Sequence, residues 1–144
     1  MMESSLAIHQ QKLLYRILSS YSETQAIYLF GSWGTEYQTQ HSDLDIAILL
    51  PPEIAKHVGP REWLTLSQAL ASAADMEKAD LINLRQVDTV LRKEVITADR
   101  RIWCADESAA LEFEALTLSL YHQLQFERQD IINDAIKTGR FRHA

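Results

Sequence analysis

Cysteine is almost absent from the sequence, with only Cys104 among 144 residues. A single cysteine cannot form a disulfide bond within the chain, and this is typical of proteins in a reducing compartment. The first residues are polar and amphipathic, so they lack the basic patch and apolar run that mark a secretion signal. We therefore expect a cytoplasmic protein.

Long apolar runs and an excess of basic residues are missing as well. The apolar stretches are no longer than a strand, whereas a helix that spans a bilayer needs roughly 18 consecutive apolar residues. We therefore expect no membrane insertion. Lys and Arg number 14 against 20 Asp and Glu, which gives a formal net charge of -6. Because an acidic surface repels phosphate chains, we expect no direct nucleic-acid partner.

The sequence does contain enough apolar residues for one core. Hydrophobic residues make up 47% of the 144 residues, so we predict a single domain over residues 1–144. The last predicted segment is one long helix or two joined ones, and its apolar sides need cover from this chain's own core or from a partner. Apolar spacing predicts helices over about residues 4–20, 32–37, 60–74, 87–98 and 106–138, and strands over about 26–30, 43–50, 78–84 and 101–104.

Asp43 and Asp45 carry the clearest chemical signal. They lie two positions apart in a predicted strand, so both side chains point to the same face, with attachment points about 6.6 Å apart. Leu44 and Ile46 point the other way, toward a core. Two neighbouring carboxylates repel each other unless a cation lies between them, and oxygen ligands favour a hard ion such as Mg²⁺. We therefore predict that Asp43 and Asp45 bind magnesium.

A second signal lies at Gly31 and Ser32, directly after the predicted strand 26–30. A glycine lets the backbone approach a phosphoryl oxygen closely. Backbone amides at the start of the predicted helix 32–37, with Ser32 as its cap, would attract an anion. We expect a phosphate-binding turn here.

Asp80 lies in a later predicted strand. If that strand neighbours the strand of Asp43 at the usual spacing of about 4.8 Å, the three aspartates form one cluster. Asp80 would then hold the metal on the acceptor side and help to draw the proton from an attacking hydroxyl.

These residues together resemble the signature of the DNA polymerase beta-like nucleotidyltransferase superfamily: Gly31-Ser32, ten intervening residues, Asp43-Leu44-Asp45 and a later Asp80. The small size is similar to that of its minimal nucleotidyltransferases, the antitoxin halves of HEPN/MNT toxin–antitoxin modules. The resemblance covers about residues 25–104 and leaves the helical segment 106–138 outside it. It implies an α+β fold, in which a mixed sheet has helices packed on one face and a long C-terminal helical segment is added.

The resemblance also implies an activity. In such enzymes two Mg²⁺ ions are held at the positions of Asp43, Asp45 and Asp80, and ATP is bound at Gly31 and Ser32. AMP is transferred to a tyrosine of a cognate HEPN-type RNase toxin, with which the antitoxin forms a hetero-oligomer. Two alternatives stay open: transfer to an RNA end or a small hydroxylated molecule, and a non-catalytic antitoxin that neutralises its toxin by binding alone.

The loop between the two motifs departs from many relatives. Residues 33–42 contain no Lys or Arg, so the triphosphate charge would be met by Mg²⁺, by backbone amides and by a more distant cation such as Lys78 or Arg85. Trp33 either stacks on the nucleotide or packs in the core. His41 either contacts phosphate or is merely exposed.

Overall fold

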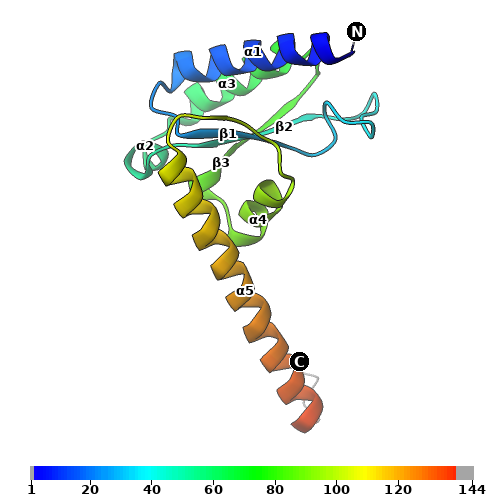
Figure 1. Ribbon diagram of the computed structural model, residues 1–144, viewed down its shortest axis with the longest axis vertical. Helices are drawn as coiled ribbons and strands as arrows, with labels where there is room; N and C mark the ends of the chain where they lie inside the picture. The colour runs from blue at the N-terminus through cyan, green and yellow to red at the C-terminus, as the bar shows by residue number, and fades with distance from the viewer. Residues whose placement is uncertain (1, 139–144) are drawn as a thin grey trace.

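Short apolar runs form a four-stranded sheet at the centre of the protein (Figure 1). The computed structural model describes residues 2–138, with side chains from residue 6 onward. β2 runs antiparallel to β1 and parallel to β3, and β4 pairs antiparallel with β1, so the sheet is mixed. The strands are β1 (Ala26–Phe30), β2 (Leu44–Leu49), β3 (Ala79–Asn83) and β4 (Arg101–Cys104), in the order β3-β2-β1-β4.

One face of the sheet packs against α1 (Met2–Ser20) and α3 (Pro60–Ala73), which lie side by side over it (Figure 1). Leu44, Ile46 and Ile48 project to this face and are fully buried. Because side chains alternate along a strand, the residues between them must face the other way. The helices contribute apolar side chains at helical spacing, including Leu13, Ile17, Leu66 and Leu70.

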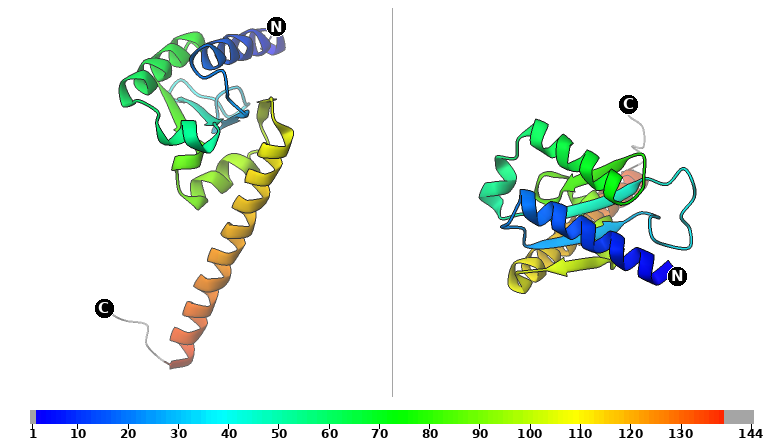
Figure 2. Two further views of the ribbon diagram at one scale, coloured as in Figure 1. Left: turned by 90° about the vertical axis from the view of Figure 1, so that its left-hand side faces the viewer. Right: turned by 90° about the horizontal axis from the view of Figure 1, so that it is seen from above.

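The other face of the sheet is covered over part of its length. α4 (Thr89–Thr97) and the first turns of α5 (Glu107–Thr138) lie on this side (Figure 2). Val95 and Phe113 pack here in one cluster with Ala47 and Leu49 of β2. Asp45 projects to the same face two residues before Ala47, outside this apolar cluster. The beginning of β2 therefore presents a polar end on the face that α4 and α5 share.

α5 extends beyond the sheet and its helices (Figures 1 and 2). Its buried residues are Ala110, Phe113 and Thr117, and none of residues 118–138 is buried. At 1.5 Å per residue, this uncovered part is about 30 Å long. The chain's own core therefore covers only the first turns of α5. None of the helices among residues 2–138 has both the length and the apolar composition to cross a membrane.

The expected α+β fold, with its mixed sheet and long C-terminal helix, is confirmed, but one predicted element is wrong. Residues 32–37 form successive turns instead of a short helix. Gly34 has a φ of 77°, which a right-handed helix does not accommodate. Trp33 packs into the core and lies 6.2 Å from the ring of His9 in α1. The backbone therefore follows turns that bury the tryptophan, and no helix forms here.

Two short elements were not predicted, and one predicted feature cannot be compared. α2 (Pro52–Lys56) and the 3-10 turn η1 (Leu84–Gln86) are too short to show a hydrophobic period in the sequence. Residues 107–138 form one helix rather than two joined ones. A glycine often ends a helix, and the sequence has Gly139 after the predicted helix 106–138, but this position lies outside the described residues.

Candidate active site

Asp45 and Asp80 lie directly opposite each other on neighbouring strands. β2 and β3 are parallel, and their register pairs Asp45 with Asp80. Paired residues on adjacent strands are about 4.8 Å apart and project to the same face. The predicted neighbourhood of the two strands is therefore confirmed. Asp43 precedes the first residue of β2 by one position and is exposed, as is Asp80.

The three carboxylates influence one another electrostatically. The pKa of Asp45 is raised to about 6, first because the carboxyl is partly buried and then because Asp80 and Asp43 are negatively charged nearby. At neutral pH Asp45 therefore carries a charge that its surroundings disfavour. A divalent cation among the three carboxylates would reverse the sign of this interaction.

Gly31 brings the backbone against the carboxyl of Asp45. Its φ is 70°, in the left-handed region that favours glycine. A Cβ added at this position would overlap Asp45 Oδ2 and lie 2.9 Å from Cγ. Both the conformation and the lack of space require glycine here. The turn after β1 therefore sits directly beside the acidic group.

The turn that follows Gly31 is held by its own hydrogen bonds. Ser32 Oγ lies 2.7 Å from Ser42 Oγ, and the amide of Thr35 donates to Ser32 O at 3.0 Å. The amides of Ser32 and Trp33 donate to no acceptor among the described residues. Successive unpaired amides at a turn can form a concavity suited to an anion. The backbone predicted to bind phosphate thus forms a turn instead of a helix start, so no helix dipole acts here.

The distant cation at residue 85 does not reach this site, and that part of the prediction is wrong. Arg85 donates through Nε to Leu50 O and through a terminal nitrogen to Gln25 Oε1 at 2.8 Å. Leu50 lies five residues beyond Asp45, about 16 Å along an extended strand. Lys78, in contrast, is exposed and lies two residues before Asp80, so it borders the acidic group.

Of the two roles expected for each residue, Trp33 has the packing role and His41 is exposed in the loop. Trp33 is only 3% exposed and belongs to the core, so its ring is not open for stacking on a nucleotide. His41 is exposed in the loop, and its backbone amide donates to Thr39 Oγ1 at 3.2 Å.

Sequence reasoning missed Arg100. This residue precedes β4 and donates hydrogen bonds to the carbonyl oxygens of Gly31 and Trp33. No periodic pattern marks it, because its contact is with a turn 69 positions earlier in the chain. The one available signal was the lack of cations in residues 33–42, which left the turn without a positive partner.

The donor set at the start of β2 and β3 suits a hard divalent ion. Asp43, Asp45 and Asp80 offer only oxygen ligands, and magnesium completes its octahedron with water and phosphate oxygens. Within residues 2–138, no three His, Cys, Asp or Glu side chains form a ready-made set of metal ligands. Like-charged carboxylates repel one another, so without a cation nothing draws the three side chains together.

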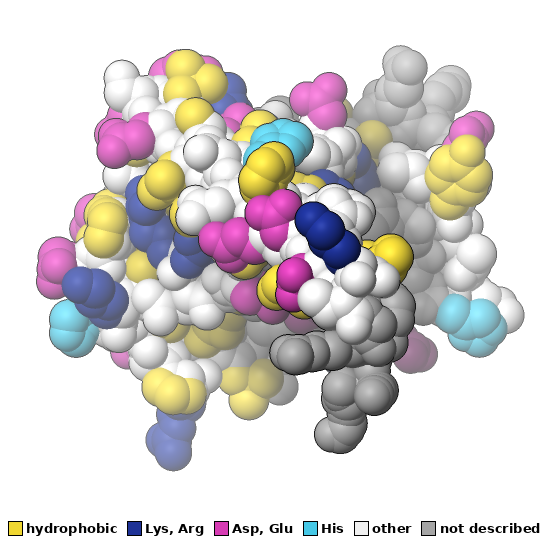
Figure 3. All heavy atoms as spheres, turned by 90° about the horizontal axis from the view of Figure 1, so that it is seen from below, with side chains coloured by type: hydrophobic (Ala, Val, Ile, Leu, Met, Phe, Trp, Pro, Cys, Tyr) yellow, Lys and Arg dark blue, Asp and Glu magenta, His cyan; other side chains and the backbone are white. Residues whose placement is uncertain are grey.

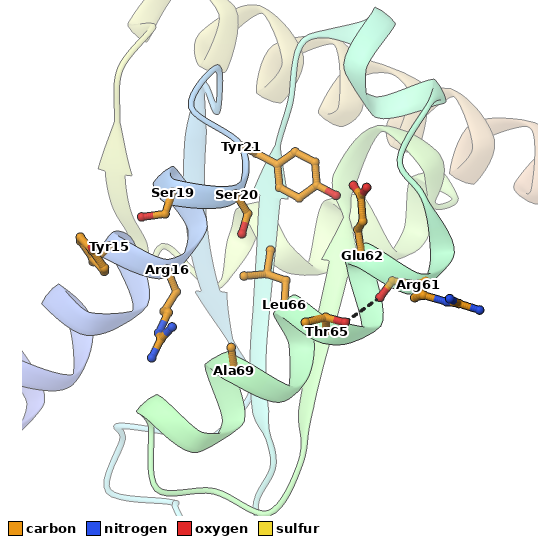
Figure 4. Close-up of a pocket in the computed structure, with 10 residues that line it drawn as sticks. All are labelled: Tyr15, Arg16, Ser19, Ser20, Tyr21, Arg61, Glu62, Thr65, Leu66 and Ala69. Carbon is orange, nitrogen blue, oxygen red and sulfur yellow. Dashed lines mark hydrogen bonds between the residues drawn. The ribbon is translucent and has the colours of Figure 1, made fainter.

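A pocket elsewhere on the surface is separate from this site. It lies between α1 and α3, has a volume of about 600 Å³, and is lined by Tyr15, Tyr21, Glu62 and Leu66 among others (Figure 4). Burial and the charge of Glu62 raise the pKa of Tyr21. Because α1 and α3 cover the face opposite to Asp45, the sheet separates this pocket from the acidic group.

The chain is similar to proteins that have been characterised. Residues 12–108 match the family described as polymerase beta nucleotidyltransferase. The chain is 36% identical over 129 residues to the protein adenylyltransferase MntA of Shewanella oneidensis. The matched region covers 90% of this chain and 88% of MntA.

Two solved structures share most of the fold. One is a toxin–antitoxin structure with AMP-PNP, at a TM-score of 0.72 and 36% identity, covering 88% of this chain and 97% of that chain. The other is a tri-AMPylated HEPN toxin of Shewanella oneidensis in complex with MNT antitoxin, at a TM-score of 0.70 and 33% identity. It covers 94% of this chain and 99% of that chain.

The raised pKa of Asp45 predicts a stability change in Asp45→Asn. Because the folded-state pKa of about 6 lies above the ordinary value of 3.8, folding favours the protonated carboxyl. The stabilisation by this group is full below about pH 4 and is lost as the pH rises through about 6. We expect Asp45→Asn to raise the thermal unfolding temperature at about pH 7.5 in EDTA, followed by circular dichroism.

At about pH 4 the same variant should gain little, because Asp45 is then protonated in the folded state and only partly ionised in the unfolded state. Asp130→Asn, which removes an exposed carboxylate on α5, is the matched control and should show no such gain. An equal gain at both pH values, or none at about pH 7.5, would contradict the electrostatic account of the site.

Proposed function

The chain belongs to the polymerase beta nucleotidyltransferase family, and on this premise we propose that it is an antitoxin adenylyltransferase. It transfers AMP from ATP to a tyrosine hydroxyl of a cognate HEPN-type RNase toxin and so neutralises the toxin. The observation that carries the proposal is the pairing of Asp45 with Asp80 beside the turn at Gly31. Similarity to an adenylyltransferase and to a complex with an AMPylated toxin supports the choice of reaction.

The residues of the site have different tasks in this reaction. The outward amides that follow Gly31, together with Ser32, would bind phosphate oxygens of ATP. Asp80 would accept the proton of the tyrosine hydroxyl while the tyrosine oxygen attacks the α-phosphorus. The bond between the α-phosphorus and the oxygen that bridges to the β-phosphorus breaks, and pyrophosphate leaves. The products are the AMP ester of tyrosine, pyrophosphate and a proton that passes to solvent.

Asp43, Asp45 and Asp80 would hold magnesium, with two ions as the resemblance to the family implies. When bound, magnesium neutralises triphosphate charge that residues 33–42 cannot, since they contain no Lys or Arg. The oxygen-only donor set and the mutual repulsion of the three carboxylates support this assignment.

The uncovered part of α5 supports the protein partner. Leu120, Leu124, Ile131 and Ile132 are exposed by 37 to 70%, although all four are large and apolar. With Tyr121 and Val90, the last three line a groove of about 500 Å³ beside the start of α4. Figure 3 views the molecule from the side to which α5 projects and shows hydrophobic side chains among charged ones.

The position of this groove favours the toxin as its occupant. α4 and the beginning of α5 lie on the same face of the sheet as Asp45. A protein that covered the groove would therefore lie on the side where AMP transfer takes place. Because helices in proteins are stabilised mainly by packing of an apolar face, the toxin would also stabilise the end of α5.

We further propose that the chain works as one domain over residues 1–144 and that it acts in the cytoplasm. α1, near the start of the chain, packs on one face of the sheet, and α5, near its end, packs on the other. This arrangement supports a single unit. A single cysteine and the RNase nature of the proposed target support the cytoplasmic site of action.

The first prediction from this proposal concerns the carboxylates. Asp43→Asn, Asp45→Asn and Asp80→Asn should each slow AMP transfer to the toxin at least about a hundredfold, because each removes a metal ligand or the proton acceptor. The measurement is the intact mass of purified toxin after incubation with ATP and magnesium. Asp75→Asn, an exposed carboxylate after α3, should retain activity.

Two outcomes would redirect the proposal. If wild type adds no AMP mass to the toxin but transfers labelled nucleotide to RNA or to a small hydroxylated molecule, the acceptor is wrong. If all three variants still neutralise the toxin fully, the protein acts by binding and the enzymatic account fails.

The second prediction concerns docking. Leu124→Glu and Ile131→Glu should weaken toxin binding about tenfold or more in calorimetric titration, because each places a charge in the apolar groove. Both residues are exposed, so the unfolding temperature of the free protein should stay unchanged. Leu64→Glu is the control, since Leu64 is 59% exposed on α3, across the sheet from the groove. Equal weakening by Leu64→Glu, or none by the α5 variants, would place the toxin elsewhere.

A further inference from the structure

The side chain of Arg100 joins the turn after β1 to the segment before β4. Its terminal nitrogens donate to Gly31 O at 3.1 Å and to Trp33 O at 2.7 Å. Its own carbonyl accepts a hydrogen bond from the amide of Leu29 at 2.9 Å. Arg100 thus contacts the end of β1 and two peptide groups of the turn that follows it.

The charge of Arg100 is committed to these carbonyl oxygens. Among residues 2–138 with described side chains, no carboxylate lies within 4.0 Å of it. Burial lowers the pKa of its guanidinium, so placing the group here carries a desolvation cost that no ion pair offsets. Arg101, its neighbour, instead binds Glu107 and Glu114 at 2.8 and 2.9 Å. The two adjacent arginines therefore differ in what they stabilise.

The two carbonyl contacts fix the direction of the turn's amides. In a trans peptide the C=O and the following N–H point in opposite directions. With Gly31 O held by Arg100, the amide of Ser32 must point away from the guanidinium. The carbonyl of Trp33 belongs to the peptide whose amide, on Gly34, donates to Gln38 Oε1 at 2.7 Å. Both peptide planes are therefore anchored from the carbonyl side.

The turn is confined on two sides. Asp45 lies against Gly31, and a Cβ added at Gly34 would lie 3.1 Å from a terminal nitrogen of Arg100. A carbonyl that accepts a charge-assisted hydrogen bond polarises its peptide and makes the attached N–H a stronger donor. The guanidinium also brings a positive charge behind a loop, residues 33–42, that has none of its own.

We propose that Arg100 is the positioning residue of the phosphate-binding turn and takes the place of the cations that residues 33–42 lack. Through Gly31 O it orients the amide of Ser32 toward the phosphates of the nucleotide, and through Trp33 O it holds the next peptide of the turn in place. This inference rests on the proposed nucleotidyltransferase function for its substrate, and on the hydrogen bonds of the free protein for its geometry.

The test compares Arg100→Met and Arg100→Lys with Arg101→Met. We expect Arg100→Met to raise the KM for ATP about tenfold in toxin modification, with kcat within about twofold, because the turn binds the phosphates equally in ground and transition states. Arg100→Lys keeps the charge but cannot contact both carbonyl oxygens, so its KM for ATP should lie between those of wild type and Arg100→Met. Arg101→Met should leave the KM unchanged.

A measurement on the free protein separates this inference from the proposed function. The amide resonances of Ser32 and Gly34 in NMR spectra without nucleotide should shift in Arg100→Met and stay in place in Arg101→Met. If wild type transfers no AMP at all, the proposed function fails, but these resonances still test whether Arg100 positions the turn.

Three results would overturn the role of Arg100. They are unshifted Ser32 and Gly34 amides in Arg100→Met, a KM for ATP that stays at the wild-type value, and an equal rise of the KM in Arg101→Met. If Arg100→Met does not fold by circular dichroism, Arg100→Lys carries the test, with an expected rise of about threefold in KM.

Discussion

The parallel pairing of β2 with β3 determines where the acidic groups of this protein meet. Its register places Asp45 beside Asp80, although 34 residues separate them in the chain. The antiparallel pairing of β1 with β2 then brings Gly31 against the Asp45 carboxyl. Two strand pairings are thus enough to bring Asp45 and Asp80 together beside the turn at Gly31, where burial first, and then the charges of Asp80 and Asp43, raise the pKa of Asp45.

The two faces of the sheet have different roles: one is buried under helices, and the other also carries the acidic residues. α1 and α3 bury one face, and of the β2 residues that point away from them only Asp45 lies outside the apolar cluster on the second face. α4 and the first turns of α5 cover the second face away from its acidic end. α5 then continues into solvent with exposed apolar side chains. The proposed partner surface and the candidate active site consequently lie on one side of the molecule.

Much of this arrangement could be predicted from the sequence, and the failures have physical causes. Alternation along β2 correctly predicts that Asp45 points away from the core that Leu44 and Ile46 enter, because the pattern is local. The short helix at 32–37 is wrong, because the left-handed φ of Gly34 and the burial of Trp33 depend on the neighbouring core. The sequence likewise contains no local signal for Arg100, because its partners lie in the turn after the neighbouring strand β1, far away in the chain.

The most direct test of this account is anomalous X-ray scattering from crystals of the protein with its toxin, soaked with manganese and a non-hydrolysable ATP analogue. Manganese shares magnesium's preference for oxygen ligands and can be located from its own signal. We predict a manganese peak bound by Asp43 and Asp45, with Asp80 at the same cluster and the analogue's phosphates against the turn at Gly31. A peak bound by none of these carboxylates, or a nucleotide seated away from that turn, would contradict the account.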